Sequence, residues 1–447
     1  MKITFIKPNI GRLGHSLYID EGRMEPLSLG VLAGLTPPDI DVALYDDRME
    51  SIPFDEQTDL AAITVETYTA RRAYEISSEY RKRNIPVIMG GMHATLIPEE
   101  VRKHCDSIFT HDAETCWQQV INDLRKNRLK SVYKGVPGVP HPGNYPNRNI
   151  YRNKGYLPLS LMQFGRGCRF HCDYCATSVY FDSKQYIRDI DTVIFEIENQ
   201  DRKIIFFVDD NIVSNSKAAK ELFNELISLK IKWVSQATID VTEDKELMKL
   251  MADSGCLGNV IGFESINLKN LILMEKSPNI SINFDSYKDQ LEILRDYGLQ
   301  TWAAFTLGYD YDEVDNIKKT CDFALENRFA FAAFNILMPY PNTPLYRSLK
   351  NHGRLLYDGC WWLHPEYRFN YAAFVPDRMT PEQLTEACFK ARSRFNSFGS
   401  IMRRAFDSKT TLSSLFRLIL HFKYNRLFQK ETFKKQGMRF GLRETKE

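Results

Sequence analysis

The sequence predicts an α/β protein in which two parallel sheets follow each other along the chain. Short apolar runs alternate with segments of helical spacing over about the first 90 residues, and the alternation resumes between residues 159 and 337. This pattern is typical of parallel strands whose sheet is covered by helices. At 447 residues the chain exceeds what one hydrophobic core usually supports, so we expect more than one domain.

The first predicted sheet comes from the N-terminal part of the chain. Its strands are expected at Ile3–Ile6, Val42–Tyr45, Leu60–Val65 and Pro86–Met89. A helix is expected over Tyr68–Asn84, with Thr67 or Thr69 as its cap. The order indicates a Rossmann-like or flavodoxin-like domain, whose ligands lie beyond the carboxyl ends of the strands. Gly90 and Gly91 follow the fourth strand, where they suit either close approach of a ligand or a plain turn.

The second predicted sheet has six strands separated by helical segments. They are expected at Leu159–Phe164, Lys203–Val208, Lys232–Ala237, Asn259–Phe263, Thr301–Leu307 and Ala332–Leu337. This order predicts an incomplete (β/α) barrel. Functional groups of such barrels lie at the carboxyl ends of the strands, where the sequence has Asp209, Asp210, Gln236, Glu264 and Tyr309. Asp209 and Asp210 are equally suited to capping the next helix.

Three cysteines lie within eight residues, at Cys168, Cys172 and Cys175, whereas the other six are scattered singly. Three thiolates at one place are typical ligands of a soft metal centre. With no fourth cysteine nearby, a four-iron cluster would keep one iron open to a substrate. A zinc ion with His171 as the fourth ligand is the alternative.

The spacing Cys168-x3-Cys172-x2-Cys175, with Tyr174 before the last cysteine, resembles the signature of the radical S-adenosylmethionine (SAM) superfamily. The resemblance implies a [4Fe–4S] cluster on the three thiolates, with SAM on the open iron. The residues it implies for SAM binding are Tyr174, Asp209, Asp210, Gln236, Glu264 and Tyr309. In this scheme Tyr174 and the Tyr309 segment lie beside the adenine, the two aspartates receive the SAM amino group, and Gln236 and Glu264 contact its carboxylate or ribose.

A small α/β domain, a Gly-Gly-x-His-Ala-Thr loop and then the cysteine motif together resemble the cobalamin-dependent radical SAM enzymes, the class B methylases. The implied cobalamin contacts are Gly90, Gly91, His93, Thr67 and Tyr68. Corrinoid proteins that place a histidine on the cobalt carry Asp-x-His-x-x-Gly, and His15, His93, His104 and His111 all lack that context. A Rossmann-like domain that no longer binds a corrinoid is the alternative.

The resemblance implies an enzyme that methylates an unactivated carbon of a small molecule or natural product, through a 5′-deoxyadenosyl radical and methylcobalamin. It also implies an external electron donor of the flavodoxin or ferredoxin type. The alternatives are a cobalamin-dependent cyclase or ring-rearranging enzyme, a cobalamin-free radical SAM enzyme, and a zinc-stabilised nucleic-acid-binding protein. The net charge of only +2 argues against nucleic acid. Cysteines without framework spacing, and no apolar stretch of about 18 residues, predict a cytoplasmic protein.

We expect a Rossmann-like cobalamin-binding domain over residues 1–134, a linker over 135–152, a radical SAM partial barrel over 153–345 and a mostly helical region over 346–447. The aromatic run Gly359–Pro365 is interpreted as core, with a substrate pocket as the alternative. From Met402 to the end there are twelve Lys or Arg and four Asp or Glu. This basic tail is expected to pack on its own protein or to be solvated, with contact to an anionic membrane as the alternative.

Overall fold

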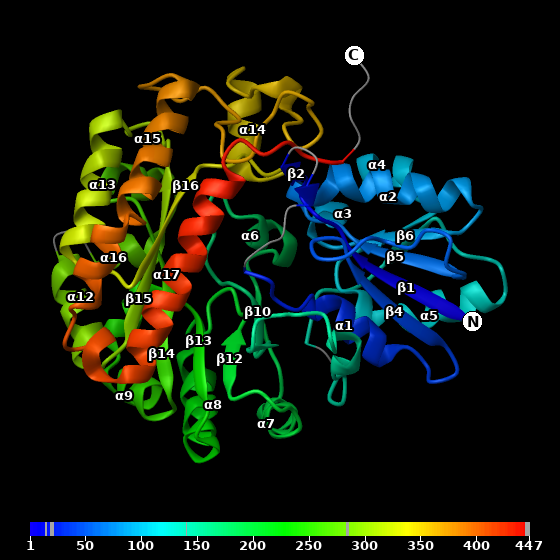
Figure 1. Cartoon of the computed structure of the whole chain (residues 1–447), viewed down its shortest axis with the longest axis horizontal. Helices are drawn as coiled ribbons and strands as arrows, with labels where there is room; N and C mark the ends of the chain where they lie inside the picture. The colour runs from blue at the N-terminus through cyan, green and yellow to red at the C-terminus, as the bar shows by residue number, and fades with distance from the viewer. Residues whose placement is uncertain (14–15, 18–21, 140, 283–285, 443–447) are drawn as a thin grey trace.

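The computed structural model describes residues 1–13, 16–17, 22–139, 141–282 and 286–442, so His15 lies outside the described residues. Two six-stranded sheets lie beside each other, the N-terminal one on the right of Figure 1 and the second on the left. Helices pack against both sheets. Both sheets predicted from the sequence are therefore present.

The N-terminal sheet is parallel throughout its described pairs. Its strands, in spatial order, are β4 (Asp41–Asp46), β1 (Lys2–Lys7), β5 (Leu60–Thr64), β6 (Val87–Gly90), β7 (Ser107–Thr110) and β8 (Val132–Lys134). The order reverses beside β1, as in flavodoxin-like sheets, where ligands lie outside the strand ends at the reversal. The four predicted strands are confirmed. Strands β7 and β8 were not predicted, because they are short and mix polar with apolar residues.

Side chains of the N-terminal sheet contribute to two hydrophobic cores, one on each face of the sheet. The helices of this part are α1 (Leu27–Leu35), α2 (Ala70–Lys82), α3 (Met92–Leu96), α4 (Pro98–Val101) and α5 (Trp117–Arg125). Ile3 and Phe5 pack with residues of α1 and α5, whereas Ile6 and Ile63 pack with residues of α2. Because both faces are covered, the strands are apolar almost throughout.

The helix predicted over Tyr68–Asn84 is present as α2, but the predicted threonine cap is wrong. No side chain caps α2 at Thr69. Thr69 instead forms a capping box with Glu66 around the short 3-10 helix η1 (Thr67–Thr69) that precedes α2. The threonine hydroxyl is used one turn earlier than the helical spacing indicated.

The second sheet contains the six strands predicted for the barrel, and they neighbour each other in chain order. They are β9 (Ser160–Met162), β12 (Ile204–Phe207), β13 (Lys232–Ala237), β14 (Cys256–Glu264), β15 (Gln300–Leu307) and β16 (Phe331–Ile336). All described pairs are parallel. Strands β9 and β16 are the two edges of this sheet, so the barrel is open between them.

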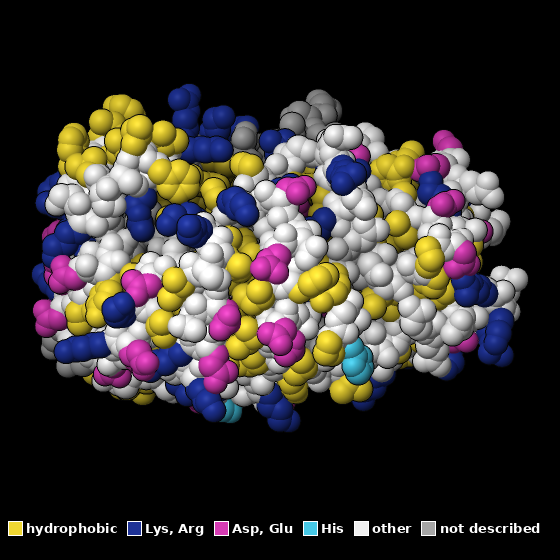
Figure 2. All heavy atoms as spheres, turned by 90° about the horizontal axis from the view of Figure 1, so that it is seen from below, with side chains coloured by type: hydrophobic (Ala, Val, Ile, Leu, Met, Phe, Trp, Pro, Cys, Tyr) yellow, Lys and Arg dark blue, Asp and Glu magenta, His cyan; other side chains and the backbone are white. Residues whose placement is uncertain are grey.

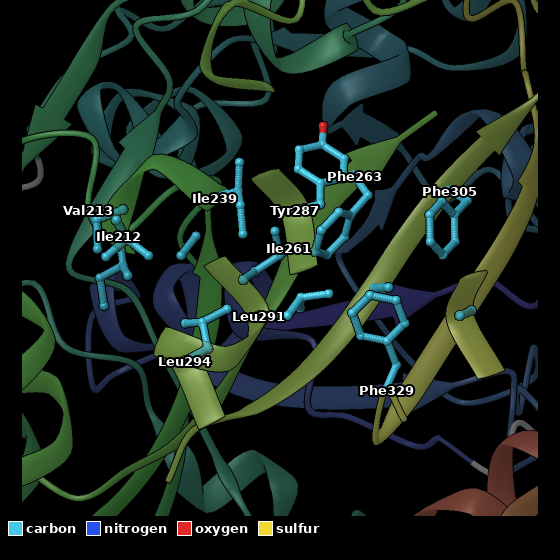
Figure 3. Packing of buried hydrophobic residues seen from close by; sticks show 14 of the residues in the cluster. Ile212, Val213, Ile239, Ile261, Phe263, Tyr287, Leu291, Leu294, Phe305 and Phe329 are labelled. Carbon is cyan, nitrogen blue, oxygen red and sulfur yellow. The ribbon is translucent and has the colours of Figure 1, made fainter. Parts of the chain in front are cut away.

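Helices cover the outer face of the barrel sheet. They are α7 (Ile190–Glu198), α8 (Ser216–Leu229), α9 (Lys245–Asp253), α12 (Tyr287–Asp296), α13 (Val314–Glu326) and α15 (Pro381–Phe395). Figure 3 shows part of this core, in which Phe263 and Phe305 from the strands lie near Tyr287 and Phe329. Thr380 caps α15 in a capping box, with Pro381 at the first helical position.

The remaining elements are short or lie near the C-terminus. They are the hairpins β2 (Arg12–Leu13) with β3 (Ser16–Leu17) and β10 (Gly165–Gly167) with β11 (Gln185–Ile187), the helices α6 (Ala176–Phe181), α10 (Leu268–Leu273), α11 (Ser277–Ile282), α14 (Pro344–Asn351), α16 (Phe398–Ala405) and α17 (Leu415–Lys435), and the 3-10 helices η2 (Arg102–His104), η3 (Ala113–Thr115), η4 (Arg148–Tyr151), η5 (Ile239–Glu243), η7 (Tyr357–Gly359) and η8 (Thr411–Ser413). No helix in the described part of the chain is long and apolar enough to cross a membrane.

Helix α17 lies across the open side of the barrel. The ring of Phe428 lies 4.6 Å from that of Trp302 on β15 and 5.6 Å from that of Phe331 on β16. On the other side of the opening, Tyr424 and Leu427 pack with a small apolar cluster formed by β9, β12 and the segment before β9. The basic tail thus packs on its own protein, as predicted.

The aromatic run of the C-terminal region is core, as interpreted from the sequence. Trp361 and Trp362 are fully buried. They pack with residues of the N-terminal sheet and α2, and Phe440 near the chain end joins the same cluster. These aromatic side chains hold the C-terminal region against the N-terminal sheet.

A buried arginine attaches α16 and α17 to the start of β16. Arg404 is 1% exposed and donates five hydrogen bonds, two of them to the carbonyl oxygens of Phe329 and Ala330. Another goes to the side chain of Asn425 on α17, at 3.1 Å. Burial lowers the pKa of Arg404 to about 9. Its acceptors would stay buried and unpaired without it.

We predict that Arg404→Met lowers the free energy of unfolding by about 3 kcal/mol, because the buried acceptors lose their donor. Arg403→Met, on the exposed side of the same helix, should change it by less than about 0.5 kcal/mol. Urea denaturation followed by circular dichroism measures both. Equal midpoints for the two variants would contradict the prediction.

Candidate functional site

The three clustered cysteines lie in a loop between β10 and α6, close to the carboxyl end of β9. Cys172 is buried and Cys168 and Cys175 are partly buried, and all three are free thiols. Gly167, just before the first cysteine, has a φ of +78°, and a Cβ there would lie 2.1 Å from the carbonyl oxygen of Lys184. The glycine before the cysteines is therefore required by both backbone conformation and space.

The three thiols are near enough to influence each other electrostatically. Burial, together with negative charge on Cys175, Glu264 and Cys168, raises the pKa of Cys172 to about 11. The ammonium group of Lys276 opposes this effect on Cys168 and Cys172. Three thiolates in this site therefore need positive charge, which Lys276 supplies in part and a bound metal centre would complete.

The zinc alternative requires the three thiols and His171 to converge on one metal ion. In the described part of the chain, no three His, Cys, Asp or Glu side chains are grouped around a point that could hold a single metal ion. His171, the fourth ligand of the zinc alternative, is exposed. In an iron–sulfur cluster each thiolate binds a different iron atom, so the three sulfur atoms need not converge.

Two consecutive carboxylates hold, from the barrel side, residues 164–175, which include β10 and the three cysteines and which we call the cluster loop. Asp209 is 1% exposed and accepts hydrogen bonds from the backbone N–H groups of Phe164, at 2.9 Å, and Gly165, at 2.5 Å. Asp210 accepts from the backbone N–H of Gly167 at 2.9 Å and from the hydroxyl of Thr177 at 3.1 Å. Burial raises the pKa of both, that of Asp209 to about 7.

The sequence suggested two roles for Asp209 and Asp210, which are binding of SAM and capping of the next helix. The side chain of Asn215, not that of either aspartate, caps α8. The carboxylates are occupied by backbone N–H groups of the cluster loop, so they position that loop. Gln236 supports the same corner by donating from its side chain to the carbonyl oxygen of Asp209, at 3.1 Å.

The end of β14 carries a carboxylate and a buried cation. Glu264 has a φ of +60°, accepts from the hydroxyl of Thr306 at 2.6 Å and pairs with the ammonium group of Lys276 at 3.3 Å. A Cβ on Gly262 would lie 2.3 Å from the Glu264 carboxylate, so the glycine makes room for the pair. Lys276 was not predicted, because a single lysine between two short helices has no sequence signal.

Tyr174 and Tyr309 lie together beside the cluster loop. Their ring centroids are 6.4 Å apart, and the hydroxyl of Tyr309 donates to the carboxylate of Asp173. Burial raises the pKa of Asp173 to about 6 and raises that of Tyr309. The structure thus brings the cysteines, Tyr174, Glu264 and Tyr309 to one place, together with the unpredicted Lys276.

A cavity of about 580 Å³ lies between the two sheets. Gly90 and Gly91, at the carboxyl end of β6, line it from the N-terminal side, and Arg166 from the cluster loop lines it from the other. The volume lies in the usual range for a small-molecule or cofactor site, roughly 300–1,000 Å³. Gly91 is also needed for the turn, since its φ is +111° and a Cβ would lie 2.9 Å from the carbonyl oxygen of Val65.

Arg166 connects the cluster loop to the N-terminal sheet through buried ion pairs. Its guanidinium donates to Asp112 at 2.9 Å and to Glu114 at 2.8 Å, both in the loop that follows β7. Tyr180 on α6 donates to the other oxygen of Asp112 at 3.0 Å. The cysteine loop and the cavity wall are thereby fixed to each other.

Three of the residues predicted to contact cobalamin do not line this cavity. His93 is fully buried, and its ring nitrogens lie 3.2 Å from the hydroxyl of Thr67 and 3.1 Å from the carboxylate of Glu100. Tyr68 packs among the aromatic rings around Trp361. The side chains of Thr67, Tyr68 and His93 therefore hold the loops together and are not directed to the cavity between the sheets.

His111 is the histidine that lines the cavity, and it was not predicted as a site residue. It follows β7 with a φ of +60°. Its Nδ1 is buried and has no hydrogen-bond partner among the described residues. Burial lowers the pKa of His111, which favours the neutral ring. The local sequence has no recognised motif, and only the unpredicted strand β7 brings the ring to this position.

Comparison with known proteins adds to this geometry. Residues 162–324 match the Radical SAM superfamily. The chain is 29% identical to bacteriochlorophyllide d C-12(1)-methyltransferase of Chlorobaculum tepidum, over 87% of this chain and 86% of that protein. It is 28% identical to bacteriochlorophyllide d C-8(2)-methyltransferase of the same organism, over 89% and 91%. The fold is similar to that of the radical S-adenosylmethionine methyltransferase TsrM of Kitasatospora setae, solved with cobalamin and a [4Fe–4S] cluster bound, with a TM-score of 0.68 at 14% identity over 97% and 99% of the two chains.

The raised pKa of Asp209 predicts a pH-dependent stability. The folded state keeps this carboxyl protonated from its ordinary pKa of 3.8 up to about 7, whereas the unfolded state ionises it. The protonated Asp209 therefore contributes about 4 kcal/mol to the free energy of unfolding. This contribution is complete below about pH 4 and is lost as the pH rises toward 7. We expect unfolding free energies of Asp209→Asn to lack this decline between pH 4.5 and 8. Asp191→Asn, on an exposed carboxyl of α7, should follow the wild type, and parallel profiles for all three proteins would contradict the assignment.

Proposed function

We propose that this chain, which contains a radical SAM domain, is a cobalamin-dependent enzyme that methylates an unactivated carbon of a small molecule. One observation carries the proposal. The loop that holds the three thiols, and only three, shares the wall of a cavity with the carboxyl ends of the N-terminal strands, through Arg166 on one side and Gly90 on the other. A cluster and a second large cofactor can therefore act on one substrate.

When bound, the [4Fe–4S] cluster and SAM would supply the radical chemistry and cobalamin would supply the methyl group. Cys168, Cys172 and Cys175 would hold the cluster. Asp209 and Asp210 keep the cysteine loop in place through its backbone N–H groups. The cofactors would carry out electron and methyl transfer, and the protein would bind and orient them.

The SAM site would use the groups gathered around Glu264. Its carboxylate can accept hydrogen bonds from ribose hydroxyls, and Lys276 beside it can pair with the SAM carboxylate. Tyr174 and Tyr309 offer ring surface to the adenine. Gln236, Asp209 and Asp210 would support this site from within the protein, because their described hydrogen bonds go to backbone groups and, for Asp210, also to the hydroxyl of Thr177.

Cobalamin would lie in the cavity between the sheets, with Gly90, Gly91 and His111 around it. His111 is a fitting contact, since its buried Nδ1 has no partner in the part of the chain that the structure describes. Both reported relatives are named for bacteriochlorophyllide d, so chlorin-type tetrapyrroles are the first substrates to test. A reduced flavodoxin or ferredoxin would supply electrons, which agrees with a reducing, cytoplasmic setting for nine free thiols.

The cluster is tested by anaerobic reconstitution. We expect about four irons per chain and cleavage of SAM to 5′-deoxyadenosine by the reduced protein. Cys172→Ala should lose both properties, because two thiolates cannot hold the cluster. Cys388→Ala removes a buried free thiol that lies outside the cluster loop and should keep both. Stoichiometric zinc in place of iron, or equal iron in the two variants, would contradict the proposal.

The cobalamin assignment is tested by the amount and absorption spectrum of cobalamin that stays bound after gel filtration. We expect about one cobalamin per chain. His111→Ala should lower the affinity for cobalamin at least about tenfold, because it removes a cavity-lining group. Methylation consumes two SAM per turnover, giving S-adenosylhomocysteine as well as 5′-deoxyadenosine. A protein that retains no cobalamin would be a cobalamin-free radical SAM enzyme, and one that forms 5′-deoxyadenosine alone would be a cyclase or ring-rearranging enzyme.

A further inference from the structure

The N-terminal half of helix α17 exposes apolar side chains, although Tyr424, Leu427 and Phe428 farther along the helix pack on the barrel. His421 and Asn425 are buried at 0% and 1% exposure, whereas Leu415 and Ile419 on the same helix are 72% and 54% exposed. In a surface helix of a globular protein the apolar stripe ordinarily faces the core. The outward stripe of α17 therefore needs an explanation other than packing within this chain.

Exposed apolar side chains from α16 to α17 form what we call the outer patch. Its members are Phe398, Phe406, Leu412, Leu415, Phe416, Ile419 and Phe422. Figure 2 shows hydrophobic side chains gathered at the upper left of the molecule, beside a group of Lys and Arg side chains. Large exposed apolar patches rimmed by polar groups mark protein or membrane contacts.

The inward face of α17 is fixed, so the outer patch cannot turn toward the core. Asn425 accepts from the guanidinium of Arg404 and donates to the carbonyl oxygen of Ala330 at 3.2 Å. His421 hydrogen-bonds the carbonyl oxygen of Ile401 at 3.1 Å. Near the start of the helix, Arg417 donates to the carbonyl oxygen of Gly298 at 2.7 Å. Rotating the helix would leave these buried polar groups unpaired.

The charged residues of the segment that carries most of the outer patch are all basic. Residues 408–430 contain five Lys or Arg and no Asp or Glu. Lys423, Arg426 and Lys430 are exposed on α17 and form no ion pair with a carboxylate among the described residues. A surface that combines apolar anchors with unpaired cations is complementary to an anionic lipid bilayer, where the anchors enter the interface and the cations lie among the headgroups.

We propose that the outer patch and the cations of α17 bind the protein reversibly to an anionic membrane surface. The helix lies on the bilayer, because no described helix is long and apolar enough to span one. This inference depends only on α16 and α17 and not on the proposed methylation. An apolar substrate would nevertheless be within reach of an enzyme held at the bilayer.

Flotation of the full-length protein with vesicles tests the inference. We expect binding to phosphatidylcholine vesicles that contain about one-third phosphatidylglycerol, and much weaker binding to phosphatidylcholine alone. Leu415→Ser/Phe416→Ser/Ile419→Ser should weaken partition at least about tenfold, because the anchors are lost. Lys423→Gln/Arg426→Gln/Lys430→Gln should remove the preference for anionic vesicles.

A matched control uses three similarly exposed apolar residues of another helix. Leu268, Ile272 and Leu273 on α10 are 42%, 55% and 41% exposed, and their serine variant should float like the wild type. Thermal unfolding verifies that all variants are folded. Wild-type protein that stays with the unbound fraction, or apolar variants that float as the wild type does, would overturn the proposal. So would a dimer, seen by light scattering, that the α17 serine variant converts to monomers without any vesicle binding.

Discussion

A buried cation joins the two halves of this molecule. Arg166 lies two residues before the first cysteine, and its guanidinium is held between Asp112 and Glu114 from the N-terminal sheet. Removing one partner of a buried ion pair leaves an uncompensated charge, so the pairs form only when both parts are in place. The position of the cysteine loop therefore depends on the N-terminal sheet as well as on the barrel.

The barrel holds the same loop from the opposite side by a different interaction. Asp209 and Asp210 accept hydrogen bonds from backbone N–H groups on the cysteine side of β9. Their carboxylates are buried, which raises the pKa of each, so this support is built at an electrostatic cost. Such positioning is what a cluster with one open iron requires, because the substrate must meet that iron in a fixed orientation.

The described part of the C-terminal region contributes side chains to the cores of both sheets. Trp361 and Phe440 pack with the N-terminal sheet, whereas Leu384 and Phe395 of α15 pack with the barrel. Helix α17 fills the opening between β9 and β16 with Tyr424 and Leu427, while Leu415 and Ile419 near its start face outward. The same helix can therefore support the barrel and present a surface to a membrane.

Local pattern predicted the strands and the group of three neighbouring cysteines. Apolar runs identified four N-terminal strands and all six barrel strands, and the spacing of Cys168, Cys172 and Cys175 indicated the cluster, because these signals lie within a few neighbouring residues. Tertiary structure decided which distant groups meet. Lys276 and His111 reach the site through folding alone, and His93 is directed into a core. Hydrogen bonds and ion pairs between separated segments leave no periodic mark in a sequence, so the contacts that position the cofactors are visible only in the folded chain.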